Sequence, residues 1–444
     1  MNYINQVIED TRRRYPHEEE YINTVREILG SLEELIKDKE DYYRENAVLE
    51  RLINPERIIT FRVAWTDDQG QVQVNTGYRV QHSSLLGPYK GGLRFHPSVN
   101  QSIIKFLALE QTFKNSLTGL KLGGAKGGSD FDPKNKSDRE IMNFCQAFIT
   151  ELSRHIGPYT DVPAGDMGVG KREIGYMFGQ YRKIRNQYSG VLTGKDLAYG
   201  GSLIRMESTG YGIIYLTDEI LKHHKMSLEG KTILVSGSGN VALHTIEKAI
   251  ELKAKVVSAS DSQGFIYDPK GIDIDLLKDI KVNKRMRISE YAKLREGSSY
   301  FPGEKPWRLK ADLVIPCATQ NEIDLDDVKM ILDNGCLALI EGSNGPSSLE
   351  ALNYLKDKDI IFVPSKAANA GGVATSLFEM SQNAQLLGWT SEMVDERLEA
   401  TMRNIARNII TSNEKYAYDK NYMVGTNIFA FERLVDSLLK QGVI

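Results

Sequence analysis

The chain has 444 residues, with 56 Lys or Arg against 59 Asp or Glu, so its formal net charge is −3. Hydrophobic residues make up 41% and charged residues 26%, as in ordinary globular proteins, which excludes disordered, collagen-like and low-complexity classes. The length predicts two domains rather than one. The near-neutral balance gives no basic field over the whole chain, so neither nucleic acid nor a membrane is expected as a partner.

The cysteines and histidines form no pattern typical of a disulfide framework or a metal site. The 3 cysteines lie far apart without a CxxC pair, and the 7 histidines include no HExxH motif. No apolar run approaches the roughly 20 residues that a membrane-spanning helix requires, and the N-terminus has no apolar core of a signal peptide. We therefore expect a cytoplasmic protein that holds no metal.

The first part of the chain predicts helices and an antiparallel hairpin. Residues 17–52 repeat apolar side chains at helical spacing, which predicts an amphipathic helix. Residues 58–82 alternate apolar and polar side chains around a central turn, as a β-hairpin does. Two glycine-dense stretches, 87–95 and 122–128, flank a helix that we predict over 100–117.

Beyond residue 230, short apolar runs alternate with helical or polar segments. These runs are residues 232–236, 255–259, 312–316, 336–340 and 359–363. Short, nearly continuous apolar strands separated by helices are typical of a parallel, doubly wound sheet. We therefore predict an α/β fold with two domains. An N-terminal substrate-binding and oligomerisation domain would cover 1–200, with 424–444 returning to it, and a Rossmann-type dinucleotide-binding domain would cover 201–423.

A glycine fingerprint follows the first of these strands. Residues 231–242 read KTILVSGSGNVA, which places Gly237, Gly239 and Ala242 in a G-x-G-x-x-A motif. The first glycine allows a tight turn, the second lets the backbone approach a pyrophosphate, and the helix N-terminus offers N–H groups and partial positive charge. Asp261, at the end of the next strand, is the acid expected near a ribose. The fingerprint predicts a nicotinamide dinucleotide site.

The residues alone leave the choice between NAD and NADP open. Asp261 would accept a hydrogen bond from a ribose 2′-hydroxyl and repel a 2′-phosphate, which favours NAD. However, Ser260 and Ser262 flank it, and both can donate to a phosphate. The segment KVNKRMR (281–287) carries four cations that would suit a phosphate, although a solvated charged helix face is the alternative.

Three lysines lie in unusual surroundings. Lys90 lies in GPYKGG, Lys126 in GGAKGG, and Lys114 on the helix predicted between them, where it shares a face with Gln111. Two such cations suit a substrate with two carboxylates, and a third could act as a base near neutral pH. Asp166, in DVPAGDMGVG, is a candidate proton shuttle, with an Asx turn as the structural alternative.

These residues belong to longer stretches that resemble the hexameric glutamate dehydrogenases of bacteria and lower eukaryotes. The matching stretches are GPYKGGLRFHPSVN (87–100), LEQTFKNSLTGLKLGGAKGGSDFDPK (109–134), TDVPAGDMGVG (160–170), GGSLIRMESTGYG (200–212), VSGSGNVA (235–242) and VPSKAANAGGVATSLFEMSQNA (363–384). The resemblance extends over nearly all of residues 50–444. It implies reversible oxidative deamination of L-glutamate to 2-oxoglutarate and ammonium, in a cleft between two domains that closes over the substrate. It also implies a homohexamer.

Carried over by position, the resemblance implies how the substrate is held. Lys90 and Ser381 would bind the side-chain carboxylate of glutamate or 2-oxoglutarate. Gln111 and Lys114 would bind the α-carboxylate, and the backbone of Gly165 would bind the amino group.

The resemblance also implies the catalytic groups. Lys126 would be the catalytic lysine, which activates water against the iminium and stabilises the carbinolamine. Asp166 would pass protons to and from the substrate nitrogen, and Asn369 would help to shape the cleft beside the nicotinamide.

For the cofactor, the resemblance favours NADP(H), with NAD(H) or dual use left open by Asp261. Lys281, Lys284 and Arg287 would clasp the 2′-phosphate. The cofactor-binding set implied by the fingerprint and the resemblance together is Arg205, Thr209, Gly237, Gly239, Asn240, Asp261, Ser262, Lys281, Lys284 and Arg287.

Two other functions are weaker interpretations of the same residues. A dehydrogenase for an apolar amino acid would carry an apolar side chain in place of Lys90, because a buried lysine without a carboxylate partner is costly. A dinucleotide-binding regulator without turnover would need neither Lys126 nor Asp166, and the chain has both.

Overall fold

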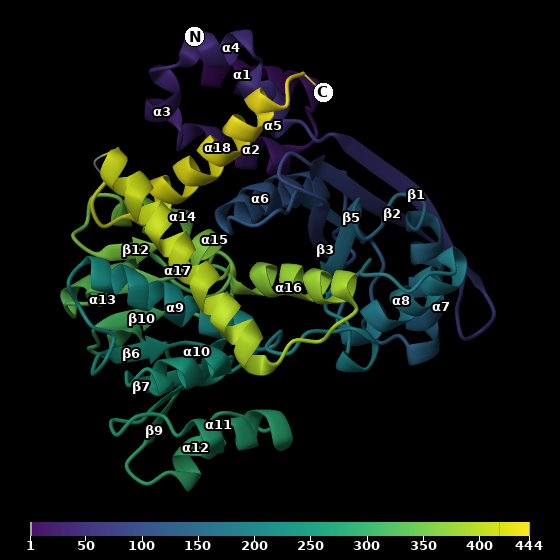
Figure 1. Cartoon of the computed structure of the whole chain (residues 1–444). Helices are drawn as coiled ribbons and strands as arrows, with labels where there is room; N and C mark the ends of the chain where they lie inside the picture. Colours follow the sequence, from purple (N-terminus) through teal and green to yellow (C-terminus); the bar gives the residue numbers. More distant parts are fainter. Residues whose placement is uncertain (1, 417, 444) are drawn as a thin grey trace. The chain divides into compact units, whose positions relative to one another are not determined.

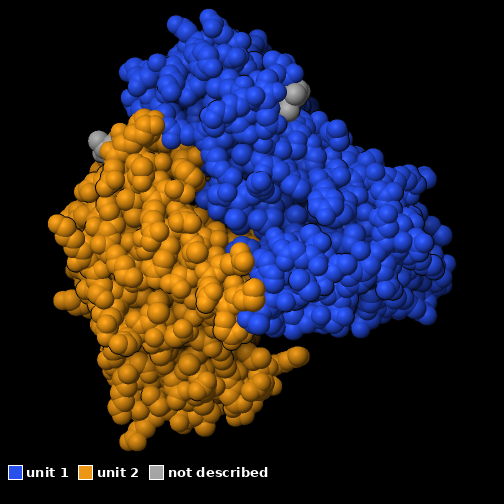
Figure 2. Space-filling model, in the orientation of Figure 1, with its two compact units in different colours: residues 1–203, 376–390, 430–444 blue, residues 204–375, 391–429 orange. Residues whose placement is uncertain are grey.

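The computed structural model describes residues 2–416 and 418–443, and the chain divides into two compact units (Figures 1 and 2). Unit 1 consists of Met1–Leu203, Ser376–Thr390 and Ala430–Ile444. Unit 2 consists of Ile204–Thr375 and Ser391–Phe429. Each unit is built around its own sheet.

Unit 1 begins with a group of short helices. They are α1 (Tyr3–Arg14), α2 (Glu19–Gly30), α3 (Glu33–Lys37), α4 (Glu40–Glu45) and α5 (Val48–Ile53). The single amphipathic helix predicted over 17–52 is therefore wrong, since this segment forms four helices. Apolar side chains such as Leu32 remain buried where the chain turns, so the periodicity continues across the breaks. One break lies at Ala47, whose φ of 47° is left-handed.

The sheet of unit 1 has five strands in the order β1-β2-β4-β3-β5. The strands are β1 (Arg57–Thr66), β2 (Val72–Ser83), β3 (Tyr89–Phe95), β4 (Gly124–Ser129) and β5 (Asp161–Gly165). β1 and β2 pair antiparallel, which confirms the predicted hairpin. β3 is parallel to both β4 and β5, so equivalent ends of these three strands lie together.

Three helices follow the strands of this sheet. They are α6 (Gln101–Leu117), α7 (Asp138–Leu152) and α8 (Lys171–Arg185), and α7 and α8 lie side by side (Figure 1). An aromatic core packs between α7 and the sheet, in which the rings of Phe131 and Phe144 stack with centroids 3.8 Å apart. This core fixes β3, the strand that carries Lys90, because Phe95 of the same strand packs edge-on against Phe144.

The second half of a long helix also belongs to unit 1. Helix α16 (Gly371–Gln385) was expected wholly within the dinucleotide domain, but its residues from Ser376 onward group with unit 1. A buried ion pair accounts for this, because Lys195 Nζ lies 2.7 Å from Glu379 Oε1 and both side chains are at most 1% exposed. The C-terminal helix α18 (Tyr422–Lys440) returns to unit 1 from Ala430. Arg433 donates to the carbonyl oxygens of Ser116, in the last turn of α6, and of Leu120, just after that helix.

Unit 2 contains a seven-stranded sheet in the order β12-β11-β10-β6-β7-β8-β9. Its strands are β6 (Thr232–Val235), β7 (Lys255–Asp261), β8 (Gly264–Tyr267), β9 (Ser299–Pro302), β10 (Leu313–Ile315), β11 (Ala338–Ile340) and β12 (Ile361–Val363). The five strands from β12 to β7 are parallel and coincide with the five predicted apolar runs. The α/β fold class and the Rossmann-type sheet are confirmed. The antiparallel pair β8–β9 at the sheet edge was not predicted.

Helices cover the strands of unit 2. They are α9 (Ser208–His223), α10 (Asn240–Glu251), α11 (Ile274–Lys278), η2 (Asp279–Asn283), α12 (Ser289–Leu294), η3 (Pro306–Arg308), α13 (Leu325–Asp333), α14 (Leu349–Leu355), α15 (Ser365–Ala368) and α17 (Ser391–Lys415). The short helix η1 (Leu197–Tyr199) belongs to unit 1. Over the described part of the chain, no helix is long and apolar enough to cross a membrane. The same residues contain no group of three or more potential metal ligands.

Candidate active site

Two adjacent glycines of β3 allow very close packing of the strands that carry the predicted catalytic residues. A Cβ atom at Gly91 would lie 1.6 Å from the carbonyl oxygen of Ala125 on β4. A Cβ atom at Gly92 would lie 2.9 Å from Cβ of Asp166 and 3.3 Å from Nζ of Lys126. Any side chain at these positions would therefore push β4 or the loop after β5 away. The glycines bring Lys126 and Asp166 together over one strand.

Lys126, within β4, and Asp166, directly after β5, form an ion pair. Lys126 Nζ lies 3.0 Å from Asp166 Oδ2, and the two side chains are 9% and 24% exposed. Arg94, on β3, donates from Nε to the same oxygen at 3.1 Å. Burial raises the pKa of Asp166, but the charges of Lys126 and Arg94 and their hydrogen bonds outweigh it and hold the pKa below its ordinary value. Asp166 is therefore ionised near neutral pH.

A hydrogen-bonded chain connects Lys90 to helix α6. Lys90 is buried on β3, and its carbonyl oxygen accepts a hydrogen bond of 3.0 Å from Nδ2 of Asn115. Gln111, one turn earlier on α6, donates to Oδ1 of Asn115 at 2.7 Å. Lys114, three residues after Gln111, is half-buried on the same helix. The structure thus places the predicted substrate residues Lys90, Gln111 and Lys114 on two directly connected elements.

A fully buried ion pair supports β3 from within the sheet. Nε of Arg79, on β2, donates to Asp161 Oδ2 at 2.9 Å, and both side chains are 0% exposed. Nη1 of Arg79 also donates to the carbonyl oxygen of Gly91 at 3.2 Å, and Gln81 donates to Asp161 at 2.9 Å. Sequence reasoning missed this pair because its members are 82 residues apart and form no local motif.

The remaining predicted substrate residues lie in both units. Gly165 ends β5, directly before Asp166. Ser381 is half-buried on the part of α16 that belongs to unit 1, between Glu379 and Gln382, whose side chains bind residues 194–202. Asn369 lies in unit 2, where it donates from Nδ2 to Asn344 Oδ1 at 2.8 Å.

The fingerprint loop of unit 2 makes a tight turn before an uncapped helix N-terminus. Gly237 has a φ of +83°, and a Cβ atom there would lie 2.9 Å from the carbonyl oxygen of Cys317. Gly239 precedes α10 without a side-chain cap, and a Cβ atom there would meet nothing within 4 Å. Ala242 is fully buried where α10 packs on the sheet. The first backbone N–H groups of α10 thus begin at an open surface, where an anion can bind them.

Asp261 is held by the basic segment that follows it. Its carboxylate accepts backbone hydrogen bonds from Gln263 at 2.9 Å and from Ile288 at 3.1 Å. Lys281 Nζ and Arg287 Nη1 lie 3.9 and 4.0 Å from its Oδ2. The two cations offset the charge that would repel a 2′-phosphate, so the presence of Asp261 does not by itself require NAD.

The basic segment does not act as one cluster. Arg287 also donates to Ser262 Oγ at 3.1 Å, which places an exposed guanidinium beside an exposed hydroxyl. Lys284 instead pairs with Asp279 at 2.7 Å, one turn earlier on its own segment. The structure therefore brings Lys281, Arg287 and Ser262 together and leaves Lys284 with a different partner.

Three further cofactor candidates gather at the start of α9. A Cβ atom at Gly372 would lie 3.0 Å from Thr209 Oγ1 and 3.5 Å from Arg205 Nη1. Asn240, at the start of α10, donates from Nδ2 to the carbonyl oxygen of Met206 in the same region. Arg205, Thr209 and Asn240 thus lie around the N-termini of α9 and α10.

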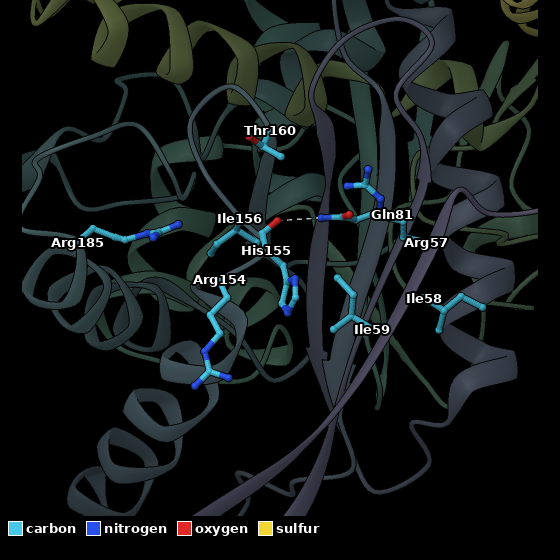
Figure 3. A pocket seen from close by; sticks show the side chains of 9 residues that line it. All are labelled: Arg57, Ile58, Ile59, Gln81, Arg154, His155, Ile156, Thr160 and Arg185. Carbon is cyan, nitrogen blue, oxygen red and sulfur yellow. Dashed lines mark hydrogen bonds between the residues drawn. The ribbon is translucent and has the colours of Figure 1, made fainter. Parts of the chain in front are cut away.

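A separate basic pocket opens on unit 1 (Figure 3). Its volume is about 490 Å³, and its lining includes Arg57, Arg154, Arg185 and His155 but no carboxylate. Gln81, whose amide donates to the carbonyl oxygen of His155 at 2.9 Å, joins the wall of this pocket to the buried Arg79–Asp161 pair. None of the predicted substrate or cofactor residues lines it.

Comparison with known proteins identifies the family. Residues 200–442 match the model of the Glutamate/Leucine/Phenylalanine/Valine dehydrogenases, and residues 55–183 match the model of the dimerisation domain of the Glu/Leu/Phe/Val dehydrogenases. The chain belongs to this dehydrogenase family.

Within the family, several glutamate dehydrogenases match the chain over nearly its full length, which confirms the resemblance predicted from sequence. The NADP-specific glutamate dehydrogenase of Helicobacter pylori is 51% identical over 99% of this chain and 100% of its own. The NAD(P)-specific glutamate dehydrogenase of Xylanibacter ruminicola is 53% identical over 99% of each chain. The crystal structure of Plasmodium falciparum glutamate dehydrogenase superimposes with a TM-score of 0.95 at 51% identity, covering 99% of this chain and 95% of that one.

Proposed function

We propose that the chain is an NADP(H)-preferring glutamate dehydrogenase, which catalyses the reversible oxidative deamination of L-glutamate to 2-oxoglutarate and ammonium. The observation that carries the proposal is the ion pair between Lys126, within β4, and Asp166, directly after β5, on the same sheet as the buried Lys90. The full-length similarity to glutamate dehydrogenases supports the same reaction.

The substrate is a dicarboxylate, because a lysine on β3 and another on α6 can each bind one carboxylate. Lys90 on β3, with Ser381, holds the side-chain carboxylate, while Gln111 and Lys114 on α6 hold the α-carboxylate. A buried lysine is strongly stabilised by an anionic partner, so an amino acid with an apolar side chain would bind with a large loss of affinity.

Lys126 and Asp166 divide the chemistry of the substrate carbon and nitrogen. The nicotinamide, when bound, supplies the site that takes or returns the hydride. Lys126 Nζ orients and activates the water that attacks the iminium carbon and stabilises the carbinolamine. Asp166, already ionised, accepts a proton from the substrate nitrogen during deamination and returns it during amination.

The 2′-phosphate of NADP(H) fits the residues that surround Asp261. Arg287 and Ser262 offer donors on an exposed surface, and Lys281 adds a second positive charge. The backbone N–H groups at Gly239 and Asn240 bind the pyrophosphate. The cytoplasm fits a chain whose Cys145, Cys317 and Cys336 are all unpaired, and we propose a homohexamer as its assembly.

Cofactor preference gives the first test of the proposal. With 2-oxoglutarate and ammonium, we expect NADPH to be oxidised faster than NADH in parallel initial-rate assays. Replacing Arg287 by alanine should lower kcat/KM for NADPH by roughly 10- to 100-fold, because one charged hydrogen bond to the phosphate is lost, and should leave NADH nearly unaffected. Lys284→Ala, which removes a cation paired with Asp279, should cost much less. A preference for NADH that Arg287→Ala does not change would contradict the proposed phosphate clamp.

Substrate selectivity gives the second test. Lys90→Leu should lower kcat/KM for 2-oxoglutarate by at least about 100-fold, since a buried charge that pairs with a substrate carboxylate is lost. Discrimination against oxo acids with a single carboxylate should weaken in the same variant. Lys121→Leu, at an exposed position next to β4, provides the control and should leave both values unchanged. An unaltered substrate profile of Lys90→Leu would show that another residue recognises the side-chain carboxylate.

A further inference from the structure

The carboxylate of Asp166 receives both of its cations on one oxygen. Lys126 Nζ lies 3.0 Å from Oδ2 and Arg94 Nε lies 3.1 Å from the same atom. In residues 2–416 and 418–443, no protein group donates a hydrogen bond to Oδ1. One oxygen is therefore fixed, and the other is left to meet a substrate nitrogen.

The position of Arg94 on β3 explains how it reaches this carboxylate. Alternate residues of a strand share a face, so Lys90, Gly92 and Arg94 point to the same side of the sheet. Because Gly92 has no side chain, Lys126 and Asp166 fit in the space between Lys90 and Arg94. The backbone N–H of Phe95 also donates to the carbonyl oxygen of Met167 at 2.9 Å, which ties β3 to the loop that carries Asp166.

We propose that Arg94 is a positioning residue of the reaction, which keeps Asp166 oriented and ionised while Lys126 is engaged with water and the substrate carbon. This inference rests on the proposed glutamate dehydrogenase activity and adds a residue to its machinery. When Lys126 contacts the water and the substrate, its contact with Asp166 Oδ2 must change. Arg94 has no such second task, so its hydrogen bond to Oδ2 can persist throughout the reaction. The ion pair with Arg94 is 23% exposed on the arginine side, so water screens it only partly.

The charges around Asp166 fix the direction of the expected pH effect. The charged groups against its carboxylate are Lys126 from β4 and Arg94 from β3, and both lower its pKa. Without Arg94, only Lys126 remains to counteract the effect of burial, which raises the pKa of Asp166. The pKa of Asp166 is therefore expected to rise. Deamination needs the ionised carboxylate as proton acceptor, and activity is lost as pH falls through that pKa. The acid limb of kcat must therefore move to higher pH.

The experiment compares Arg94→Met with the wild-type enzyme in glutamate deamination across the acidic and neutral range. Removal of one nearby opposite charge should move the acid limb of kcat upward by about one pH unit. On that limb kcat should fall roughly 10-fold, while KM for glutamate changes by less than about threefold, because Arg94 does not bind the substrate carboxylates. Arg94→Lys keeps a cation and should restore most of the wild-type profile.

Controls separate positioning from a structural role. Arg182→Met, on the exposed face of α8, removes the same charge and should leave the profile unchanged. If Arg94→Met does not fold, Arg94→Gln keeps a donor without the charge and should still shift the limb. A loss of kcat that is uniform in pH, or an unshifted limb in an active variant, would overturn the role of Arg94. A wild-type enzyme without glutamate turnover would instead overturn the proposed function.

Discussion

Replacement of Lys126 by alanine is expected to lower kcat for glutamate deamination by at least about 1,000-fold, within the range that a positioned acid–base group contributes. Lys126 is the cation closest to Asp166 and lies directly over Gly92, where no other side chain can take its place. Binding of NADPH should remain nearly intact, because the fingerprint loop lies in unit 2.

Steady-state kinetics in both directions, with NADPH binding followed by fluorescence, measures the two effects separately. A variant that kept more than about a tenth of the wild-type kcat, a change under ~1.4 kcal/mol in the barrier, would contradict the catalytic assignment. Loss of NADPH binding together with turnover would indicate a folding defect instead of a chemical one.

Asp161→Asn is expected to lower the free energy of unfolding by about 3–5 kcal/mol, the usual cost of leaving one member of a buried ion pair without its partner. Arg79 and Asp161 are both 0% exposed, so water cannot take over the lost interaction. The guanidinium of Arg79 also donates to the carbonyl oxygen of Gly91. The substitution should therefore also weaken the packing of β3, the strand that carries Lys90.

Urea-induced unfolding of the assembled enzyme, analysed by midpoint and slope, measures this effect. Asp68→Asn is the matched control, because its partner Arg139 is 64% exposed and a surface ion pair contributes at most about 1 kcal/mol. The double variant Arg79→Met, Asp161→Leu should recover much of the stability, since it leaves no buried charge. A loss below about 1 kcal/mol in Asp161→Asn would mean that Arg79 finds another partner.

The parts of the fold with strong local patterns could be predicted from the sequence. The alternation of 58–82 gives the β1–β2 hairpin, and the apolar runs beyond residue 230 give the parallel strands of unit 2. The ends of the helices before β1 could not be predicted. Buried apolar side chains continue through the breaks between these helices, so the sequence pattern looks like that of one long helix. The β8–β9 pair lacks a long apolar run and depends on pairing with β7.

The candidate site shows the same division. Lys90 and Lys126 stood out because glycines surround them. The structure shows that Gly92 leaves room for Lys126, while Gly91 lets β3 lie close to β4. Arg94 was missed although it lies within the quoted GPYKGGLRF stretch. The signal was available, because Arg94 follows Lys90 by four positions, and in a strand that spacing places both side chains on one face. No strand was predicted over residues 87–95, so the spacing of Lys90 and Arg94 could not be interpreted as two side chains on one face.

The double glycine of β3 also limits how the site can be redesigned. A methyl group at Gly91 would collide with the backbone of Ala125, and one at Gly92 would press on both Lys126 and Asp166. The floor of the site therefore has no room for new side chains. Engineering of this chain toward other amino acids must work through the tips of long side chains, such as those of Lys90 and Gln111, and must leave the strand beneath them unchanged.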